Sequence, residues 1–198
     1  PVKNMLGSDL INVWGISEEE RMKHLKLPKK KYILQEDPFN PGSMLCLVPT
    51  PKIDVALIHA QKASPDGTFR IAGPQFQDLD IAVAAKHTIV SCEELISDQV
   101  IRRNPELNTC TGFCVDAVVE VPYGAHPSQC FDYYDYDGMF FVDYDKISRT
   151  QDAFDGFITE YVNECPTHND YLDKIGASRL LALNIDEGYG YACGLKRK

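Results

Sequence analysis

The sequence predicts an α/β fold with an open, mostly parallel sheet and helices that flank it. Short apolar runs bounded by prolines or turn residues alternate with stretches that have a helical pattern. The runs expected as strands are 44–48, 53–60, 69–72, 88–91 and 114–121, and the helical stretches include 78–86 and 148–165. Strands that alternate with helices in this way are typical of βαβ units, in which neighbouring strands lie parallel.

The first half of the chain gives signals at three places. Ser17 precedes three glutamates, a pattern typical of a helix N-terminus with Ser17 as N-cap and Glu20 at the capping-box position. Residues 26–43 are polar and contain three prolines, so they are expected to form a loop or an excursion from the fold. Residues 65–68, Pro-Asp-Gly-Thr, have the composition of a tight turn between two extended segments.

The second half gives clearer periodicity. Residues 114–121 alternate apolar and polar side chains over most of their length, which indicates a strand, and a constrained loop at 122–127 follows. The helix at 148–165 is expected to begin with a capping box of Ser148 and Gln151. Its buried stripe is Phe154, Phe157, Ile158, Tyr161 and Val162. Residues 93–103 are expected as a helix, 171–175 as a helix closed by Gly176, and 180–183 as a last strand.

Composition and charge restrict the class of protein. The 198 residues are 44% hydrophobic and 25% charged, which is ordinary for a globular chain and indicates a single domain over 1–198, or a domain plus an extension. The net charge of −9 repels a phosphate backbone, so general nucleic-acid binding is not expected. No apolar run approaches the roughly 18 residues of a membrane span, which argues against an integral membrane protein. Two basic clusters are expected to be solvated, with a weak anion contact as the alternative: Lys26, Lys29, Lys30, Lys31 and Lys196, Arg197, Lys198.

The seven cysteines indicate a reducing compartment and no metal. Their number is odd, their spacing is irregular, and no Cys-x2-Cys pair occurs. A structural zinc site is therefore not expected. The sequence also lacks a secretory hydrophobic region, so a cytoplasmic location with reduced thiols fits best.

Several polar residues are candidates for chemistry, and each has a structural alternative. His59 lies in an apolar strand, where it is either a core histidine or a strand-end residue facing a cleft. His126 follows a strand, in a loop with Gly124, where it either donates a hydrogen bond to an anionic oxygen or belongs to a purely structural turn. The alternating acids and aromatics of 131–137 favour an exposed edge or a subunit contact over a metal site. Glu93 and Glu94 are interpreted as helix-start acids.

The residues alone name no reaction. The sequence contains no Gly-x-Ser-x-Gly, no Walker-type Gly-Lys-Ser/Thr and no complete Gly-x-Gly-x-x-Gly. Motif and spacing therefore define a cytosolic α/β domain with a histidine loop that faces a cleft, and nothing more specific.

A set of ordered blocks nevertheless resembles the α subunits of family I coenzyme A transferases of the glutaconate type. The blocks are 7–8, 14–17, 54–61, 63–68, 75–82, 88–94, 114–119 and 123–129. They run through almost the whole chain, and their number and order make the resemblance specific. Family α subunits are longer at the N-terminus, so the resemblance implies that this chain corresponds to the C-terminal part of such a subunit.

The resemblance implies an open sheet of the NagB/RpiA-like type and a CoA-transferase reaction with acyl-CoA as substrate. A glutamate carboxylate attacks the thioester, and the resulting anhydride is converted to a glutamyl-CoA thioester that a second acid then consumes. In the family that glutamate belongs to the partner β subunit, so no catalytic residue is expected on this chain. The implied protein is a higher hetero-oligomer that acts on a short, glutaconate-like dicarboxylic acid.

The resemblance also implies a substrate site on this chain, built from Gly7, Ser8, Gly124, Ala125 and His126. Arg70 is a further candidate partner for the remote carboxylate of the acid, and substitution of Ser8 or His126 by alanine is expected to lower turnover with little loss of folding. Two alternatives stay open. One is a decarboxylase or hydrolase subunit with the same fold, and the other is a non-catalytic segment that serves only assembly or stability.

Overall fold

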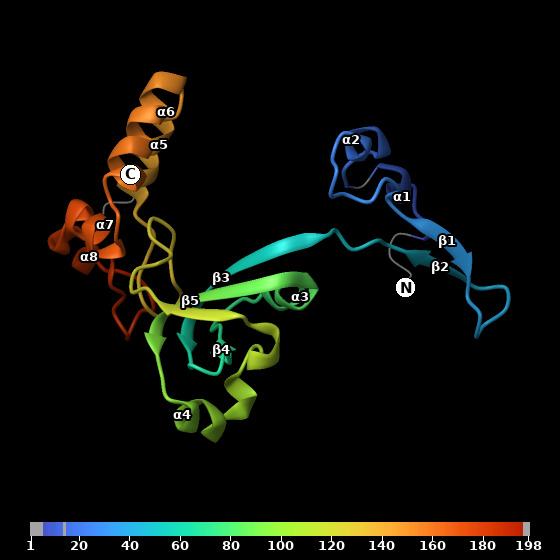
Figure 1. The fold of residues 1–198 in the computed structure, drawn as a ribbon, viewed down its shortest axis with the longest axis horizontal. Coiled ribbons are helices and arrows are strands. Elements are labelled where there is room, and N and C mark those ends of the chain that lie inside the picture. The colour runs from blue at the N-terminus through green and yellow to red at the C-terminus, as the bar shows by residue number, and fades with distance from the viewer. Residues whose placement is uncertain (1–5, 14, 196–198) are drawn as a thin grey trace.

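A computed structural model describes residues 6–13 and 15–195 and contains a four-stranded sheet (Figure 1). The strand order is β4-β3-β5-β6, with β3 at Ile53–Ala63, β4 at Phe69–Arg70, β5 at Ala85–Leu95 and β6 at Ala117–Glu120. β3, β5 and β6 are parallel, whereas β4 is antiparallel to β3. The predicted α/β class with a mostly parallel sheet is therefore confirmed.

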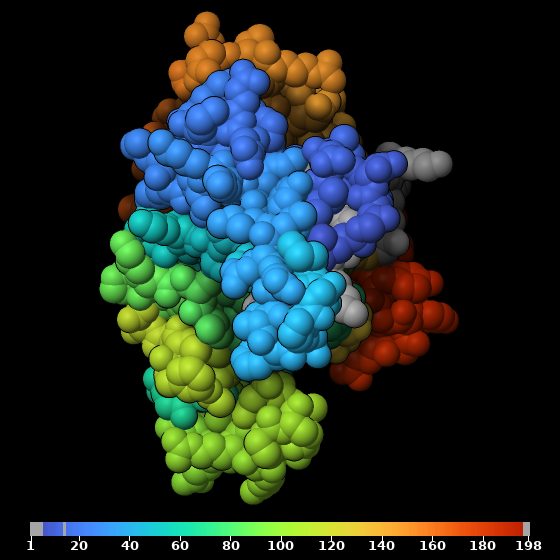
Figure 2. Space-filling view, turned by 90° about the vertical axis from the view of Figure 1, so that its right-hand side faces the viewer, coloured from blue at the N-terminus to red at the C-terminus, as the bar shows by residue number. Residues whose placement is uncertain are grey.

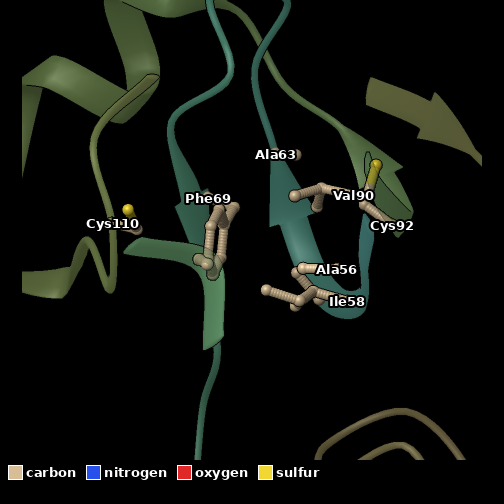
Figure 3. Packing of buried hydrophobic residues seen from close by; sticks show 9 residues of the cluster. Ala56, Ile58, Ala63, Phe69, Val90, Cys92 and Cys110 are labelled. Atoms are coloured by element: carbon tan, nitrogen blue, oxygen red, sulfur yellow. The ribbon is translucent and has the colours of Figure 1, made fainter. Parts of the chain in front are cut away.

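One face of the sheet carries the main core. Side chains alternate between faces along a strand, and Ala56, Ile58, Val90 and Cys92 point to the side of Phe69 and Cys110 (Figure 3). Helix α3 at Asp78–Ala84 contributes Ala82 to this cluster. On the opposite face the apolar side chains of Val55, Leu57, Ile89 and Val119 remain exposed in the described chain.

The N-terminal segment lies apart from the sheet in Figure 1. It contains helix α1 at Leu10–Val13, helix α2 at Glu18–Met22, and an antiparallel pair of strands, β1 at Ile33–Glu36 and β2 at Met44–Leu47. Ser17 accepts a hydrogen bond from the Glu20 amide, as predicted for an N-cap. In Figure 2 the segment faces the viewer in blue, with α5 and α6 in orange above it.

The sequence interpretation of 26–43 as a loop or excursion misses a strand. Residues 33–36 pair with 44–47 and form a hairpin, although the excursion from the main sheet is real. The basic cluster in this segment has its own partners, because Lys26 pairs with Asp54 and the buried Lys31 donates from its ammonium to the Asn12 carbonyl. The second basic cluster, 196–198, lies outside the described residues.

Several elements differ from the prediction for identifiable reasons. Residues 93–95 continue β5 because Lys62 and Ala63 pair with Glu94 and Leu95. Helix α4 then begins at Asp98 and ends at Arg103, with Ser97 as N-cap. The strand predicted over 114–121 is reduced to Ala117–Glu120, and short 3₁₀ turns occupy Pro105–Leu107 and Gly112–Cys114.

The C-terminal part is mostly helical. Its helices are α5 at Gly138–Ile147, α6 at Gln151–Ile158, α7 at His168–Ile175 and α8 at Ala177–Leu183. The predicted capping box at Ser148 is wrong, because Ser148 ends α5 and Thr150 caps α6. A π turn at Thr159–Asn163 shifts the phase of the predicted stripe, so Val162 is exposed. Within the described residues, no helix is long and apolar enough to cross a membrane.

The predicted last strand at 180–183 is also wrong. Gly176 ends α7 with a positive φ of 91°, and a new helix follows directly. Leu180 and Leu183 are three residues apart and both buried, which is the spacing of a helix face. A short apolar run has no periodicity that separates the two structures, and here tertiary packing decides for the helix.

Candidate functional site

The carboxyl ends of β3, β5 and β6 meet at one edge of the sheet, where α/β proteins bind their ligands. Glu93 lies near the end of β5, and its side chain is only 3% exposed. Its carboxylate accepts hydrogen bonds from the Tyr134 hydroxyl (2.5 Å), the His59 Nε2 (2.6 Å) and the Tyr123 amide (2.6 Å). A carboxylate has enough lone pairs for these three donors, so Glu93 joins two strands, the loop after β6 and the segment before α5.

His59 is thus a strand-end residue with a defined position. Its ring lies between Glu93 and Ser91, whose Oγ is 2.8 Å from Nδ1. Gly124 packs directly against this ring, since a Cβ at position 124 would lie 2.7 Å from His59 Cε1 and 2.7 Å from the Val121 carbonyl oxygen. The small residue in the loop is therefore required by the histidine beside it.

The backbone amides of the loop around Gly124 donate hydrogen bonds to acceptors within this chain. The Gly124 amide donates to the Val121 carbonyl, that of Ala125 to the Tyr134 hydroxyl, and that of His126 to the Tyr123 carbonyl. These three N–H groups are the donors that an anionic intermediate would need from this loop. Because each already has an acceptor, the loop is built as a wall whose shape is fixed.

His126 points away from this edge, into the C-terminal helices. Its side chain is fully buried, and its nitrogens lie 2.6 Å from the Tyr171 hydroxyl and 3.2 Å from Asp137 Oδ2. Burial lowers the pKa of His126 below its ordinary value, although Asp137 partly opposes the shift. Burial likewise opposes ionisation of Asp137, but hydrogen bonds from Arg179, the Phe140 amide and His126 outweigh it and hold the pKa of Asp137 low.

The other predicted substrate residues lie elsewhere. Gly7 and Ser8 are exposed and directly precede α1, where Ser8 Oγ accepts a hydrogen bond from the Leu10 amide. Helix α1 is far from α5–α8 in Figure 1, so the described chain does not bring Gly7 and Ser8 together with the 124–126 loop. The Arg70 side chain binds the C-terminal end of α4 and the segment that follows it. Its guanidinium donates hydrogen bonds to Asn108 Oδ1 and to the carbonyls of Ile101 and Asn104.

A cleft of about 400 Å³ opens beside Glu93. Its walls include Tyr123, Tyr133, Tyr134 and Asn184. The rings of Tyr123 and Tyr134 stack with centroids 4.9 Å apart, and the Tyr123 hydroxyl donates to Asn184. Asp132 and Glu187 also line the cleft, and these carboxylates make it a poor site for a dianion on its own.

One group among the described residues has the donor types of a metal site. His59, Glu93 and Cys130 each place one ligand atom within 4.8 Å of the others. The nitrogen and oxygen of His59 and Glu93 are 2.6 Å apart, however, whereas two ligands at about 2.1 Å from a tetrahedral zinc are separated by about 3.4 Å. Burial, with the charges of Glu93 and Asp132, raises the pKa of the Cys130 thiol to about 12. The geometry described is that of a hydrogen-bond network.

Sequence reasoning missed the central residues of this site. Glu93 lies in β5 and is not the helix-start acid that the sequence suggests, and residues 131–137 are not simply an exposed edge, since Tyr134, Asp135 and Asp137 are buried. An acid at the end of a β-branched strand was the available signal for Glu93. Nothing local indicated that Tyr134 would reach it.

Comparison with known proteins identifies the class. Residues 10–121 match the family model for coenzyme A transferase, and the chain belongs to that family. It is 55% identical over 191 residues to the A subunit of glutaconate CoA-transferase from Acidaminococcus fermentans, a match that covers 96% of this chain and 60% of that protein. The crystal structure of the A. fermentans enzyme superposes with a TM-score of 0.83 over 97% of this chain and 61% of that one.

Two further relatives are more distant. The A subunit of 3-oxoadipate CoA-transferase from Pseudomonas knackmussii is 34% identical over 140 residues, which cover 70% of this chain and 48% of that protein. The crystal structure of a variant of the decarboxylase AibA/AibB matches with 26% identity and a TM-score of 0.52, over 68% of this chain and 53% of that one. The chain thus spans about half to three fifths of the length of these relatives.

Proposed function

We propose that this chain is part of a CoA-transferase subunit that moves CoA between an acyl-CoA and a short dicarboxylic acid of the glutaconate kind. The observation that carries the proposal is the 55% identity to the A subunit of glutaconate CoA-transferase over 96% of the chain. The alternative of a decarboxylase or hydrolase subunit is weaker, since the decarboxylase AibA/AibB is only 26% identical over a shorter stretch.

The nucleophile in this proposal is a glutamate of a β subunit. Its carboxylate attacks the thioester carbonyl and expels CoA thiolate, which leaves an acyl-glutamyl anhydride. The thiolate then attacks the glutamyl carbonyl of the anhydride, so that free acid departs and a glutamyl-CoA thioester remains. A second acid reverses both steps. Glu93 is not suited to this role, because its carboxylate is buried and accepts three hydrogen bonds.

In this mechanism the chain supplies part of the cleft. The loop at Gly124, Ala125 and His126 forms a rigid wall of one part, and the exposed Gly7 and Ser8, which the described chain holds away from that loop, supply donors from the N-terminal segment. Ser8 Oγ accepts a bond from the Leu10 amide, which leaves its hydroxyl hydrogen available for a carboxylate or a developing oxyanion. CoA enters as substrate, and the reaction as proposed needs no metal.

One feature of the sheet supports an assembly with a β subunit. Parallel sheets are usually covered on both faces, yet Val55, Leu57 and Ile89 on β3 and β5 remain exposed in the described chain. Apolar surface of this kind favours association, and we propose a higher hetero-oligomer.

We also propose a cytoplasmic location, because all seven cysteines are free and such thiols persist in a reducing compartment.

The test is co-expression with a β subunit, followed by intact-mass analysis of the complex and a CoA-exchange assay with acetyl-CoA and glutaconate. Formation of glutaconyl-CoA without net release of free CoA supports the transferase. Release of carbon dioxide or of free CoA would instead support the decarboxylase or the hydrolase. An isolated chain that stays soluble and monomeric would support a non-catalytic role as an assembly or stability fragment.

Ser8→Ala tests the contribution of the N-terminal segment. The expected loss in kcat/KM is about 100-fold or more, since removal of a single oxyanion donor commonly costs this much. Ser178→Ala is the matched control, because Ser178 is exposed near the start of α8. Equal kinetics for the two variants would remove Ser8 from the site.

A further inference from the structure

The Glu93 carboxylate connects the sheet to the loop that follows β6. Its Oε2 accepts from the Tyr123 amide at the start of that loop, and its Oε1 accepts from the Tyr134 hydroxyl. Resting on the proposed function, we propose that Glu93 is a positioning residue for CoA transfer: it holds the loop at 123–126 against the strand ends without touching the substrate.

The position of the loop depends on Glu93 through two routes. The first is direct, since the Tyr123 amide is 2.6 Å from the carboxylate. The second passes through Tyr134, whose hydroxyl donates to Glu93 at 2.5 Å and accepts from the Ala125 amide at 2.9 Å. Two backbone N–H groups of one short loop are therefore placed by a single carboxylate.

A third contact holds the loop from the other side. The His59 ring, which bonds to Glu93 at 2.6 Å, leaves no space for a Cβ at Gly124. Glu93 sets the orientation of that ring, and the ring in turn limits how far the loop can approach β3. The loop is thus fixed by attraction at Tyr123 and Ala125 and by steric exclusion at Gly124.

The chemistry of the network requires a carboxylate. Two oxygens accept three hydrogen bonds here: the Tyr123 amide and the Tyr134 hydroxyl are donors, and His59 donates in the form that carries a proton on Nε2. A glutamine of the same shape replaces one acceptor oxygen with an NH₂ group, which then faces a donor. Glu93→Gln is therefore expected to release either Tyr123 or Tyr134 while it preserves side-chain volume.

The reaction is sensitive to such a release. If the loop forms a wall of the transfer cleft, its displacement by about 1 Å can lower the rate about 100-fold through misplacement of the reacting groups. Contacts that bind CoA outside this loop would not change, so the affinity for acyl-CoA would stay the same. The expected signature of a positioning residue is thus a fall in kcat with an unchanged KM for acyl-CoA.

The experiment compares Glu93→Gln with Glu94→Gln in the complex with the β subunit. Glu94 is the next residue on β5, carries the same charge and is exposed, where it pairs with Lys62 and Tyr133. We expect kcat to fall about 100-fold for Glu93→Gln, with a KM for acetyl-CoA close to that of Glu94→Gln and a lower melting temperature of the complex, because a buried hydrogen bond is lost. A kcat for Glu93→Gln equal to that of the control would overturn the proposal.

A double-mutant cycle tests the route through Tyr134. If Glu93 acts on Ala125 through that hydroxyl, then Tyr134→Phe lowers kcat in the wild-type background. The same substitution should lower kcat by a smaller factor in the Glu93→Gln background. Fully additive losses would show that the two side chains act independently, which contradicts the relay. Should Glu93→Gln fail to fold, Tyr134→Phe removes only one hydroxyl and allows the same comparison with the control.

Amide hydrogen exchange separates this inference from the proposed function. In the full chain, Glu93→Gln is expected to speed exchange at the Tyr123 and Ala125 amides about 10-fold or more relative to Glu94→Gln. Unchanged exchange would overturn the positioning role even in an active enzyme. An inactive wild-type complex with faster exchange in Glu93→Gln would instead overturn the proposed function and leave the positioning of the loop intact.

Discussion

The hydroxyl of Tyr134 donates a hydrogen bond of 2.5 Å to the carboxylate of Glu93 across 41 positions of sequence. Tyr134 is 2% exposed, so neither group has water as an alternative partner. Burial, together with the Glu93 charge, raises the pKa of Tyr134, which keeps its hydroxyl protonated and able to donate. This contact secures the segment before α5 to the edge of the sheet.

Tyr134→Phe is expected to lower the free energy of unfolding by about 2 kcal/mol, because it leaves the Ala125 amide without its acceptor. The matched control is Tyr133→Phe, whose hydroxyl donates to the exposed Glu94 at 3.2 Å, and it should change stability by less than about 0.5 kcal/mol. Urea unfolding of the two variants at equal concentration provides the measurement. Equal midpoints would show that the Tyr134 hydroxyl contributes nothing to stability.

Gly124→Ala is expected to destabilise the fold by more than about 2 kcal/mol, since the new Cβ would overlap the His59 ring and the Val121 carbonyl oxygen. Gly156→Ala provides the contrast. A Cβ at this position in helix α6 meets no atom within 4 Å, and alanine favours a helix by about 0.5–1 kcal/mol. Thermal melting should therefore shift in opposite directions for the two variants, and a shift in the same direction would contradict the packing described.

Arg179→Ala tests the ion pair at the base of the C-terminal helices. Asp137 is buried and accepts two hydrogen bonds from the Arg179 guanidinium. Because the arginine is itself 38% exposed, water can partly replace it, and we expect a loss of about 2 kcal/mol rather than the full cost of an unpaired buried charge. Arg149→Ala breaks the exposed pair with Asp145 and should cost less than about 0.5 kcal/mol in the same unfolding assay. Similar losses for both variants would contradict a special role for Arg179.

The sequence allowed prediction of those elements whose cause is local. The caps at Ser17 and Gly176, the turn at 65–68 and the strand at 53–60 depend on neighbouring residues, and the structure has each of them. The order of strands and helices then sufficed for the α/β class. The residues that resemble the family contributed the expected reaction and the partner.

The failures concern residues whose state is set by distant partners. Glu93 continues a strand only because β3 pairs with it, and it is buried only because Tyr134 and Tyr123 supply donors. A substrate contact of His126 stays a prediction, but the sequence gives no sign of Asp137 and Tyr171, which lie 11 and 45 positions away and contact both of its nitrogens. No periodicity encodes such contacts. His126→Ala is therefore expected to lower stability, contrary to the sequence-based expectation of little loss of folding, because the side chain is buried and both of its nitrogens have partners.

The stability of the protein should fall in mild acid because of His126. Burial keeps the pKa of this histidine below its ordinary value of 6.5, so the unfolded chain binds a proton that the folded chain resists. The contribution of His126 to the free energy of unfolding is thus fully present above about pH 6.5. It is lost as the pH falls below that value, by up to about 1.4 kcal/mol per pH unit. The neighbouring groups do not titrate in this window, since the pKa of Asp137 is held low and that of Tyr171 is raised to about 12.

Melting temperatures between about pH 7.5 and about pH 5 provide the measurement. His126→Gln should be less stable than wild type at the upper end of this range, because the buried imidazole is lost, but its stability should depend less steeply on pH. His87→Gln is the control, since His87 is exposed beside Asp116 and should leave the wild-type slope unchanged. If wild type and His126→Gln lost stability in parallel over this range, the acid sensitivity would have to come from another group.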